Sequence, residues 1–470
     1  PCPSPNLAGT PELDLGPDVD CGILTVPESR TDLDGPTIKL AVARLKAESP
    51  DPRRTPMVYL NGGPGSTTIV ILEHFRDKGI NRDRDVIFFS QRGTFHADPM
   101  LSCAEYDGFL AESVSTSMLA PAAAQRSLDA IRACHDRLTA KGIDLSAFNS
   151  VENAADVADL RTAMGIDSWH VYGVSYGTDL ALQLIRDHPE GISSVVLDSV
   201  APPQNNLLTH LWGSAAGGYQ AVFDACAAQP TCARTYPDLA NEFTTTVARL
   251  AETPMTVDVP ASADGPAQNV VIDGYKFANV VVLRSSDAPL YASLPQMIHA
   301  TASGDGRAAA AAVQASVPSV DLMGYGLRYG VMCREAAAFT TPDAIAAEAH
   351  KVLPGFPAAV LAIQPQFARL MDECPVWDVG RADPSVNTPV QSDIPVLLLA
   401  GTFDAITQPS QADDAAATLT NSRVVRFPAI GHDVYSQSEC GRAVVADFLN
   451  RPDGYDTGCV GAMRVPVFVT

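Results

Sequence analysis

A serine between two glycines is the strongest candidate for chemistry in this sequence. The pentapeptide Gly-Val-Ser-Tyr-Gly, residues 173–177, follows a short apolar run (169–172) and precedes a helix-like segment (178–188). A side chain at either glycine would collide with the backbone in so tight a turn between a strand and a helix. Such a turn would hold the hydroxyl of Ser175 above the end of the strand, so we predict that Ser175 is a nucleophile.

A serine hydroxyl is a weak nucleophile and needs a base, which in turn needs an orienting carboxylate. After a turn of this kind, the carboxylate and then a histidine follow the serine along the chain. Asp404 follows a predicted strand over 394–400, and His432 follows a predicted strand over 423–427. Both loops should open at the same edge of the sheet as Ser175. We therefore predict a triad of Ser175, Asp404 and His432 and interpret the chain as a serine hydrolase.

Two other aspartates compete with Asp404 for the orienting role. Asp198 follows the preceding predicted strand, and Asp433 directly follows His432. Asp433 is too close in sequence to orient that ring easily, so we interpret it as a solvated loop residue. The remaining histidines are expected to be surface or packed residues: His74, His96, His135, His170, His188, His210, His299 and His350.

The oxyanion of an acyl-transfer intermediate needs backbone donors that are already in place. One should be the N–H of Tyr176, directly after the nucleophile. The other should come from the glycine-rich loop at residues 61–65, which follows a predicted strand at 57–60, and we choose Gly63. The loop lacks the Gly-Lys-Ser/Thr ending of a phosphate-binding loop, which argues against nucleotide binding.

Strand-like and helix-like segments alternate along the chain, which predicts an α/β fold with a mostly parallel central sheet and flanking helices. Further strands are expected at 22–26, 37–46, 85–89 and 194–197, and further helices at 151–164, 409–419 and 440–450.

An alanine-rich, helix-like stretch interrupts this alternation after the sixth predicted strand. We divide the chain into a first core segment (1–203), a mainly helical cap or lid (204–385) and a second core segment (386–470). About 180 residues is too long for a loop. The insertion should lie over the carboxyl ends of the strands, where ligands bind in open α/β sheets.

Composition limits the partners and the compartment. A net charge of −22 argues against nucleic acid and anionic membranes as partners. No apolar run reaches the roughly 18 residues that a transmembrane helix needs. Ten cysteines favour an oxidising compartment over buried free thiols, so we expect a secreted or cell-envelope protein whose leader was removed before residue 1.

Cysteine spacing suggests sequential pairs, although other connectivities remain open. The suggested disulfides are Cys2–Cys21, Cys103–Cys134, Cys226–Cys232, Cys333–Cys374 and Cys440–Cys459. No pair of closely spaced cysteines faces a second ligand pair, so we predict no metal site.

Several short motifs recur together in one known family. They are residues 61–66 (Asn-Gly-Gly-Pro-Gly-Ser), 91–94 (Gln-Arg-Gly-Thr), 173–178, 196–198, 401–404 and 431–432. With these motifs the chain resembles the α/β-hydrolase family of proline iminopeptidases and tripeptidyl aminopeptidases, in particular its secreted bacterial branch. The likeness covers both core segments, and the insertion is only loosely similar.

The resemblance implies removal of short peptides or single residues from peptide N-termini, with the insertion as cap. It carries the roles of nucleophile, orienting acid, base and oxyanion donors onto the residues predicted above. Residues 332–335 look similar to a Cys-x-Glu element of this branch, so Glu335 is a candidate anchor for the substrate amine. The alternative is that Glu335 pairs with a nearby arginine. One departure is Ser90, where the family usually has aspartate before Gln-Arg-Gly.

Three other functions stay open at this stage. A carboxylesterase or lipase would use the same triad, because an acyl-enzyme does not distinguish amides from esters. A cap without an amine anchor could admit internal peptide bonds, which gives an endopeptidase. A catalytically silent binding protein is disfavoured by retention of all three triad residue types. We expect a peptide or small ester as substrate and no metal or organic cofactor, and the sequence does not indicate an oligomeric state.

Overall fold

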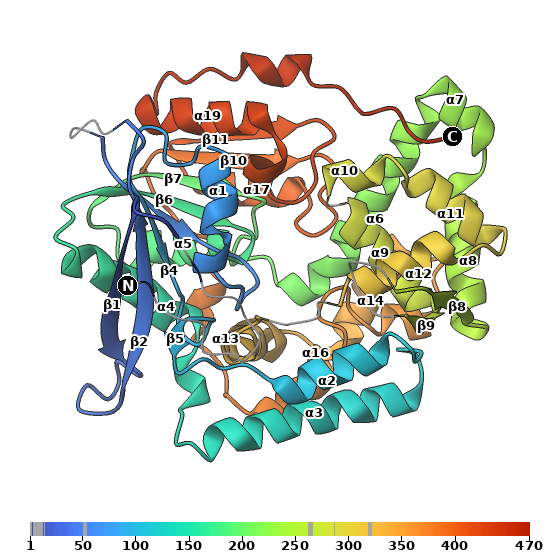
Figure 1. Ribbon diagram of the computed structural model, residues 1–470, viewed down its shortest axis with the longest axis horizontal. Coiled ribbons are helices and arrows are strands. Elements are labelled where there is room, and N and C mark those ends of the chain that lie inside the picture. Colours follow the sequence, from blue (N-terminus) through green and yellow to red (C-terminus); the bar gives the residue numbers. More distant parts are fainter. Residues whose placement is uncertain are drawn as a thin grey trace.

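A computed structural model gives the fold and describes residues 2, 13, 15–49, 54–261, 267–285, 287–317 and 322–470. Its centre is a nine-stranded sheet (Figure 1). The spatial order is β1 (Val19–Pro27), β2 (Thr37–Leu45), β4 (Val86–Phe89), β3 (Met57–Leu60), β6 (Trp169–Val174), β7 (Ile192–Asp198), β10 (Val396–Gly401) and β11 (Ser422–Phe427), while the two-residue β5 (Ala97–Asp98) pairs with β2.

Every pair of neighbours from β4 to β11 is parallel, whereas β2 is antiparallel to both β1 and β4. The parallel strands also end almost level with one another. Leu60 pairs with Gly173, Val174 pairs with Asp198, and Gly401 pairs with Phe427. The loops that follow these strands therefore open at one edge of the sheet, as the sequence predicts.

Both faces of the sheet are covered, because β3, β4, β6 and β10 are buried at every position. In β3, Val58 and Leu60 face one hydrophobic core, and Met57 and Tyr59 face the other. The first core also takes side chains from α4 and α5, and the second takes them from α1 and α19. The core helices are α1 (Leu72–Asp77), α2 (Ala104–Ser113), α3 (Pro121–Thr139), α4 (Ser150–Ala163), α5 (Tyr176–Asp187), α17 (Ser410–Ala416), α18 (Val434–Gln437) and α19 (Glu439–Asn450).

The long insertion follows β7 and ends before β10. β7 is the strand predicted at 194–197, and the additional two-residue β5 makes it the seventh strand along the chain. The helices of this segment are α6 (Leu207–Ala227), α7 (Pro230–Thr235), α8 (Leu239–Glu252), α9 (Gly274–Ser285), α10 (Ala288–Tyr291), α11 (Leu294–Ala302), α12 (Arg307–Ala315), α13 (Tyr325–Val331), α14 (Pro342–Val352), α15 (Ala358–Leu361) and α16 (Leu370–Trp377).

Two features of this segment are absent from the sequence-based expectations. An antiparallel hairpin, β8 (Met255–Val259) and β9 (Gln268–Ile272), interrupts the helices. In addition, α2 and α3, which precede the insertion in sequence, run along α16 at the bottom of the view in Figure 1. The helical layer around the insertion is therefore built from two separate parts of the chain.

Five disulfides join the pairs that the spacing suggests. They are Cys2–Cys21, Cys103–Cys134, Cys226–Cys232, Cys333–Cys374 and Cys440–Cys459, and the described residues include no free cysteine. The last of these bonds holds the start of the C-terminal segment, which crosses from α19 to α7 (Figure 1). There Gln229 donates to the carbonyl of Pro466 at 2.8 Å, and Phe468 is buried. The segment thus ties the core to the insertion.

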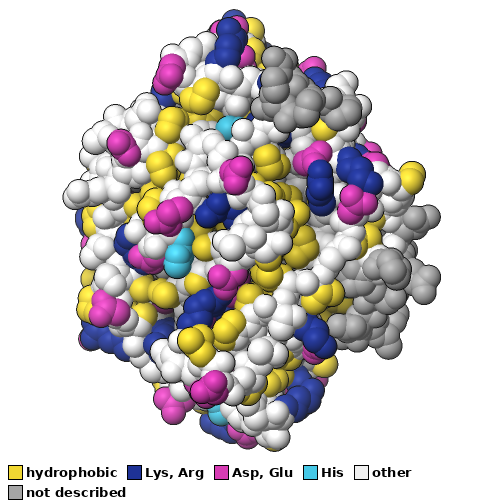
Figure 2. All heavy atoms as spheres, turned by 90° about the vertical axis from the view of Figure 1, so that its left-hand side faces the viewer, with side chains coloured by type: hydrophobic (Ala, Val, Ile, Leu, Met, Phe, Trp, Pro, Cys, Tyr) yellow, Lys and Arg dark blue, Asp and Glu magenta, His cyan; other side chains and the backbone are white. Residues whose placement is uncertain are grey.

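The acidic charge is not gathered on the face that carries β1 and β2. Figure 2 shows acidic and basic side chains interspersed there among apolar ones. Within the part of the chain that the structure describes, no helix combines the length and apolar character needed to cross a membrane.

Candidate active site

Ser175 stands at the tip of the turn between β6 and α5. Its backbone is left-handed, with φ 57°, and its N–H donates to the carbonyl of Asp198 at 3.0 Å. A Cβ atom on Gly173 would lie 2.2 Å from the carbonyl oxygen of Gly177, and one on Gly177 would lie 2.1 Å from that of Leu60. Both glycines are therefore required by the backbone that surrounds them, as the motif predicts.

Asp404 and His432 meet across the loops after β10 and β11. The Oδ2 atom of Asp404 lies 2.9 Å from Nδ1 of His432. The same carboxylate accepts the backbone N–H groups of Ile406 and Thr407 at 2.8 and 2.9 Å. The Thr407 hydroxyl donates to Oδ2 at 2.8 Å and lies 3.3 Å from Nδ1 of His432. Asp404 thus orients the ring while its own position is held by hydrogen bonds.

The two groups stabilise each other's charged forms. Burial alone would raise the pKa of Asp404, which is 1% exposed, but the His432 ring and the hydrogen bonds outweigh burial and hold the pKa below its ordinary value. Burial also disfavours the charged imidazole, yet the Asp404 carboxylate outweighs it and raises the pKa of His432. This pattern is typical of a base that must accept a proton during a reaction.

Ser175 and His432 lie at the same edge of the sheet, but they do not share a hydrogen bond among those of the described residues. The contacts of His432 with Asp404 and Thr407 both use Nδ1, which leaves Nε2 as the ring nitrogen available to a hydroxyl. Ser175 and Thr407 line one cavity, and Thr407 contacts both Asp404 and His432, whereas His432 itself lines a different cavity. Catalytic hydrogen bonds of this kind often tighten only when substrate binds.

Two backbone donors are open beside Ser175. The N–H of Gly62 donates to the side chain of Asn61 at 2.9 Å, whereas the N–H of Gly63 has no acceptor among the described residues. Tyr176 is the first residue of α5, so its N–H has no acceptor within the helix. A Cβ atom on Gly62 would lie 2.7 Å from that of Ser175, which shows how closely the loop approaches the serine.

Gln91 holds the glycine-rich loop in place through a hydrogen bond. Its Nε2 donates to the carbonyl of Asn61 at 2.9 Å, and its Oε1 accepts from Asn153 at 2.8 Å. Ser90, at the position where related sequences usually carry aspartate, is fully buried and its hydroxyl has no hydrogen-bond partner. In this chain the loop is thus supported by residue 91 and not by residue 90.

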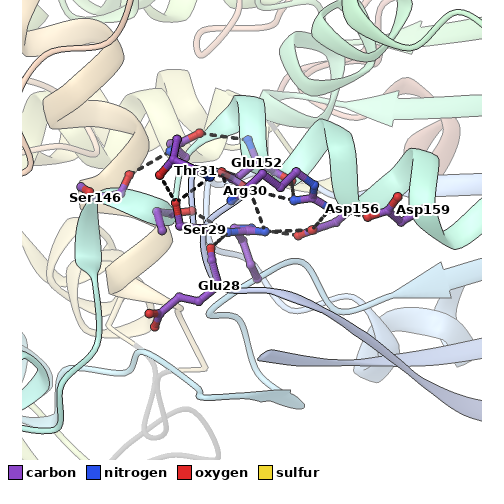
Figure 3. A network of polar contacts seen from close by, with 11 residues as sticks. Glu28, Ser29, Arg30, Thr31, Ser146, Glu152, Asp156 and Asp159 are labelled. Atoms are coloured by element: carbon purple, nitrogen blue, oxygen red, sulfur yellow. Dashed lines mark hydrogen bonds and ion pairs between the residues drawn. The ribbon is translucent and has the colours of Figure 1, made fainter. Parts of the chain in front are cut away.

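The next residue of the same motif, Arg92, anchors α4. It is fully buried, forms two hydrogen bonds of 2.8 Å with Asp156, and donates to two backbone carbonyls at 2.7 and 2.6 Å. Arg30 approaches the same helix from the loop after β1 and contacts Glu152, Asp156 and Asp159 (Figure 3). The network fixes α4 relative to the motif that supports the glycine-rich loop.

Asp198, the first rival of Asp404, does not contact the His432 ring. Its two carboxylate oxygens accept the backbone N–H groups of Val434 and Tyr435, each at 2.9 Å. The Tyr172 hydroxyl donates to it at 2.6 Å. Burial, with the nearby charge of Asp433, raises the pKa of Asp198 to about 7. Asp198 therefore holds the start of α18, directly after His432.

The prediction that Asp433 is a solvated loop residue is wrong. It is half-buried, and its carboxylate accepts from both the backbone N–H and the hydroxyl of Ser436, at 3.0 and 2.6 Å, which caps α18. Its own N–H donates to Ser199 at 2.8 Å. The left-handed backbone of Asp433 (φ 68°) directs this short side chain onto the helix that it precedes.

Glu335 lines the cavity that contains Ser175, and so does Asp179. The cavity has a volume of about 80 Å³. Glu335 lies in the π-helical turn Met332–Ala336 and is 5% exposed, and its Oε1 accepts the N–H of Ser150 at 2.7 Å. Within the described residues it forms no ion pair with an arginine, so the alternative stated above does not hold.

Neither acid forms an ion pair within the described residues, although the charges of Arg334 and Arg186 act on Glu335 and Asp179 from further away. Burial raises the pKa of Glu335 to about 7. Burial, together with the charge of Glu335, raises the pKa of Asp179 to about 8. Removing carboxylates from water is costly unless a cation or hydrogen-bond donors compensate. The cavity is therefore suited to a cationic group.

Sequence reasoning missed two residues of this site. Thr407 follows Asp404 by three positions, and Asp179 follows Ser175 by four, a spacing that places successive helical side chains on one face. The second spacing could have indicated that Asp179 faces the serine cavity. Nothing in the local sequence distinguishes Thr407 from an ordinary loop threonine.

A model of the α/β hydrolase fold family matches residues 55–439. The chain belongs to this family. The family membership fits the observed strand order and the serine at the β6–α5 turn, and it confirms the predicted fold class.

The curated relatives of this α/β hydrolase include a tripeptidyl aminopeptidase, as its motifs indicate. It is 28% identical over 200 residues to a tripeptidyl aminopeptidase of Streptomyces lividans, covering 40% of this chain and 36% of that one. It is 29% identical over 229 residues to the putative hydrolase YuaR of Escherichia coli, covering 47% of this chain and 43% of the other. The chain thus spans less than half the length of these relatives. The predicted resemblance is confirmed.

Among solved structures, a proline iminopeptidase of Mycobacterium smegmatis aligns with 92% of this chain and 99% of its own, with 17% sequence identity and a TM-score of 0.41.

Within the described residues of this α/β hydrolase, no group of three or more His, Cys, Asp or Glu side chains is placed to hold a metal ion.

Proposed function

We propose that this α/β hydrolase is a secreted or cell-envelope serine peptidase that releases short peptides or single residues from peptide N-termini. Ser175 is the nucleophile, His432 the general base and Asp404 the group that orients it. The N–H groups of Gly63 and Tyr176 form the oxyanion hole. Glu335, with Asp179, holds the substrate's free amine.

One observation carries the choice of substrate. The carboxyl groups of Asp179 and Glu335 line the same small cavity as Ser175. Within the described residues they form no ion pair and accept hydrogen bonds from the neutral groups of Gln183 and Ser150. A free α-amino group is a cation near neutral pH, with an ordinary pKa of about 8. It would supply the missing charge within one cavity of the nucleophile. A neutral acyl chain would leave both acids uncompensated.

The chemistry follows from the geometry of the loops. His432 takes the hydroxyl proton as Ser175 attacks the scissile carbonyl, and the new imidazolium is stabilised by Asp404 at 2.9 Å. The oxyanion is stabilised by N–H groups that need no rearrangement. His432 then protonates the leaving amine. In the second half of the reaction it takes a proton from the water that attacks the acyl carbonyl, and it returns that proton to the Ser175 oxygen as the acyl-enzyme bond breaks.

We also propose that residues 204–385 act as a cap over this site. Glu335 comes from this segment and Ser175 from the core, so both parts are needed to line one cavity. The five disulfides favour an oxidising compartment and support export.

Two measurements test the proposal. A fluorophosphonate probe should label the protein and fail to label Ser175→Ala, which separates an enzyme from a catalytically silent binding protein. Chromogenic peptides with free N-termini should then be hydrolysed much faster than the same peptides with acetylated N-termini. If blocking the amine makes no difference, the amine anchor is wrong.

The second candidate is a carboxylesterase. It is favoured by one observation, a larger cavity with aromatic walls next to the serine cavity. Rapid turnover of apolar esters, with indifference to a free amine, would support it over the peptidase.

A further inference from the structure

A second cavity, of about 430 Å³, lies between α2, α9, α13 and α16. Five aromatic side chains are among its lining residues: Tyr106, Tyr275, Tyr325, Tyr329 and Phe367. It is large enough to accommodate an aromatic side chain. We call it the aromatic cavity.

Three charged side chains line the aromatic cavity, and two of them are fully engaged by the protein. Lys276 donates to four backbone carbonyls, those of Ser113, Val114, Thr116 and Val271. Glu373 accepts from the hydroxyls of Ser127 and Tyr329. The donors of Lys276 are therefore used within the protein, and two hydroxyls hold the carboxyl group of Glu373, whose pKa is raised by burial.

The third charged side chain, Arg328, is different. It is half-buried, its guanidinium stacks over the ring of Phe367 at 4.2 Å, and its Nη2 donates to the carbonyl of Gln366 at 2.7 Å. It forms no ion pair with any described residue. A guanidinium has five donors in a planar fork that matches a carboxylate, and a partly desolvated cation gains from such a partner.

Gln366 provides an independent sign of a ligand at the same place. Its backbone is left-handed, with φ 64°, which is unusual for a residue with a side chain. Its Nε2 is buried and has no hydrogen-bond partner. Buried polar groups almost always have partners, and an exception calls for an explanation. An acceptor atom of a bound ligand would be one.

The position of these two residues connects the aromatic cavity to the serine. Gln366 and Phe367 line both cavities, so they form the partition between them. The start of α13 is also joined to the glycine-rich loop, because the N–H of Gly324 donates to the carbonyl of Gly65 at 2.8 Å. A ligand that reaches Arg328 therefore lies next to the site of chemistry.

We propose that Arg328 and Gln366 bind the C-terminal carboxylate of short peptide substrates, and that the aromatic cavity takes the apolar or aromatic side chain of their last residue. This rests on the proposed function and deepens it. Asp179 and Glu335 bind the amine at one end of the peptide, and Arg328 binds the carboxylate at the other. The preferred substrate is then a short free peptide and not the N-terminus of a long chain.

The first experiment compares peptides of two to five residues that end in phenylalanine, each as the free acid and as the C-terminal amide. The wild-type protein should favour the free acid by about 10- to 100-fold in kcat/KM, the range expected for a charge-assisted contact. Arg328→Gln should lose this preference through a higher KM for the acids, with the amides unchanged. The matched control is Arg307→Gln, since Arg307 is an exposed arginine of the same insertion that pairs with Asp305 and does not line the cavity.

Two further arms make the outcome decisive. Leu283→Trp, which fills part of the aromatic cavity, should raise KM for peptides that end in phenylalanine but not for those that end in glycine. Independently of catalysis, 3-phenylpropionate should bind the wild-type protein and Ser175→Ala, while 3-phenylpropanamide and the Arg328→Gln variant should show at least tenfold weaker binding. Equal treatment of acids and amides, or equal binding of the acid and its amide, would overturn the proposal. Peptide hydrolysis that persists in Ser175→Ala would instead overturn the proposed function.

Discussion

The carboxylate of Asp198 accepts the backbone N–H of Val434 at 2.9 Å, although the two residues are 236 positions apart in sequence. The contact joins the carboxyl end of β7 to the loop that carries His432. Asp198 is fully buried, so each hydrogen bond that it makes is protected from water. The position of the candidate base therefore depends on an acid that takes no part in proton transfer.

We expect Asp198→Asn to misplace His432. The amide nitrogen would face one of the two backbone N–H groups that the carboxylate now accepts, so at least one hydrogen bond is lost. Because small displacements of a catalytic group are costly, kcat/KM should fall by about 10- to 100-fold. Thermal unfolding checks that the chain still folds, and Asp413→Asn on the exposed side of α17 is the control. Unchanged kinetics would show that the loop is held by other contacts.

Substitutions of the three triad residues should lower kcat by different amounts. Ser175→Ala and His432→Ala are expected to lower kcat by about 10⁶-fold, and Asp404→Asn by about 10⁴-fold, because the base survives but is wrongly oriented. His350→Ala, an exposed histidine on α14, should leave kcat unchanged. A small effect of His432→Ala would mean that another group takes the serine's proton.

The affinity for a substrate with a free amine should depend on pH separately from the acyl-transfer step. Asp179 and Glu335, with pKa values of about 8 and 7, bind an ammonium group only when ionised. KM for peptides with a free N-terminus should therefore fall as the pH rises from about 6 to 8, until the substrate amine loses its own proton. N-acetylated esters should show no such fall in KM. For both substrates, kcat/KM should decrease as the pH drops through the raised pKa of His432, because the base must be neutral.

Glu335→Gln should stabilise the fold while weakening amine binding. The pKa of Glu335 is about 7 in the folded chain, above its value of about 4.3 when unfolded, so ionisation favours the unfolded state. The penalty is absent below the unfolded pKa and grows as the pH rises through the folded pKa. The variant keeps an acceptor for Ser150. Its free energy of unfolding should exceed that of the wild type by about 1–3 kcal/mol near pH 8 and match it near pH 4. A variant that is less stable at both pH values would contradict this account.

Arg92 should contribute far more to stability than Arg30, although both contact Asp156. Arg92 is fully buried, so Arg92→Met leaves backbone carbonyls and part of a buried carboxylate without donors, at a cost of about 3–5 kcal/mol. Arg30 is partly exposed and should cost only about 1 kcal/mol when changed to Met. Urea unfolding of the two variants measures the difference. Equal losses would mean that the network of Figure 3 acts as one unit.

Local sequence patterns were sufficient to predict several features of this protein. The turn that carries Ser175, the glycine-rich loop at 61–65 and the loops that carry Asp404 and His432 each follow a predicted strand. The structure has these strands nearly as expected, because a run of buried β-branched and apolar residues between turns has few other conformations. The level ends of the parallel strands then follow from the fold class.

The remaining features of the site depend on contacts between residues that are far apart in the sequence. The sequence favoured Asp404 over Asp198 as the partner of the imidazole, but each follows a strand, and only the packing of the loops brings Asp404 to His432. Asp433 has the same local pattern as a solvated residue, yet α18 folds back onto it. Arg328 and Gln366 lie in segments whose sequence has no recognisable motif, and the Cys-x-Glu element at Glu335 does not show what packs against that side chain. Their surroundings, and therefore their pKa values and possible partners, come from helices that are distant in sequence, because burial and charge compensation depend on what packs against a side chain and not on its neighbours along the chain.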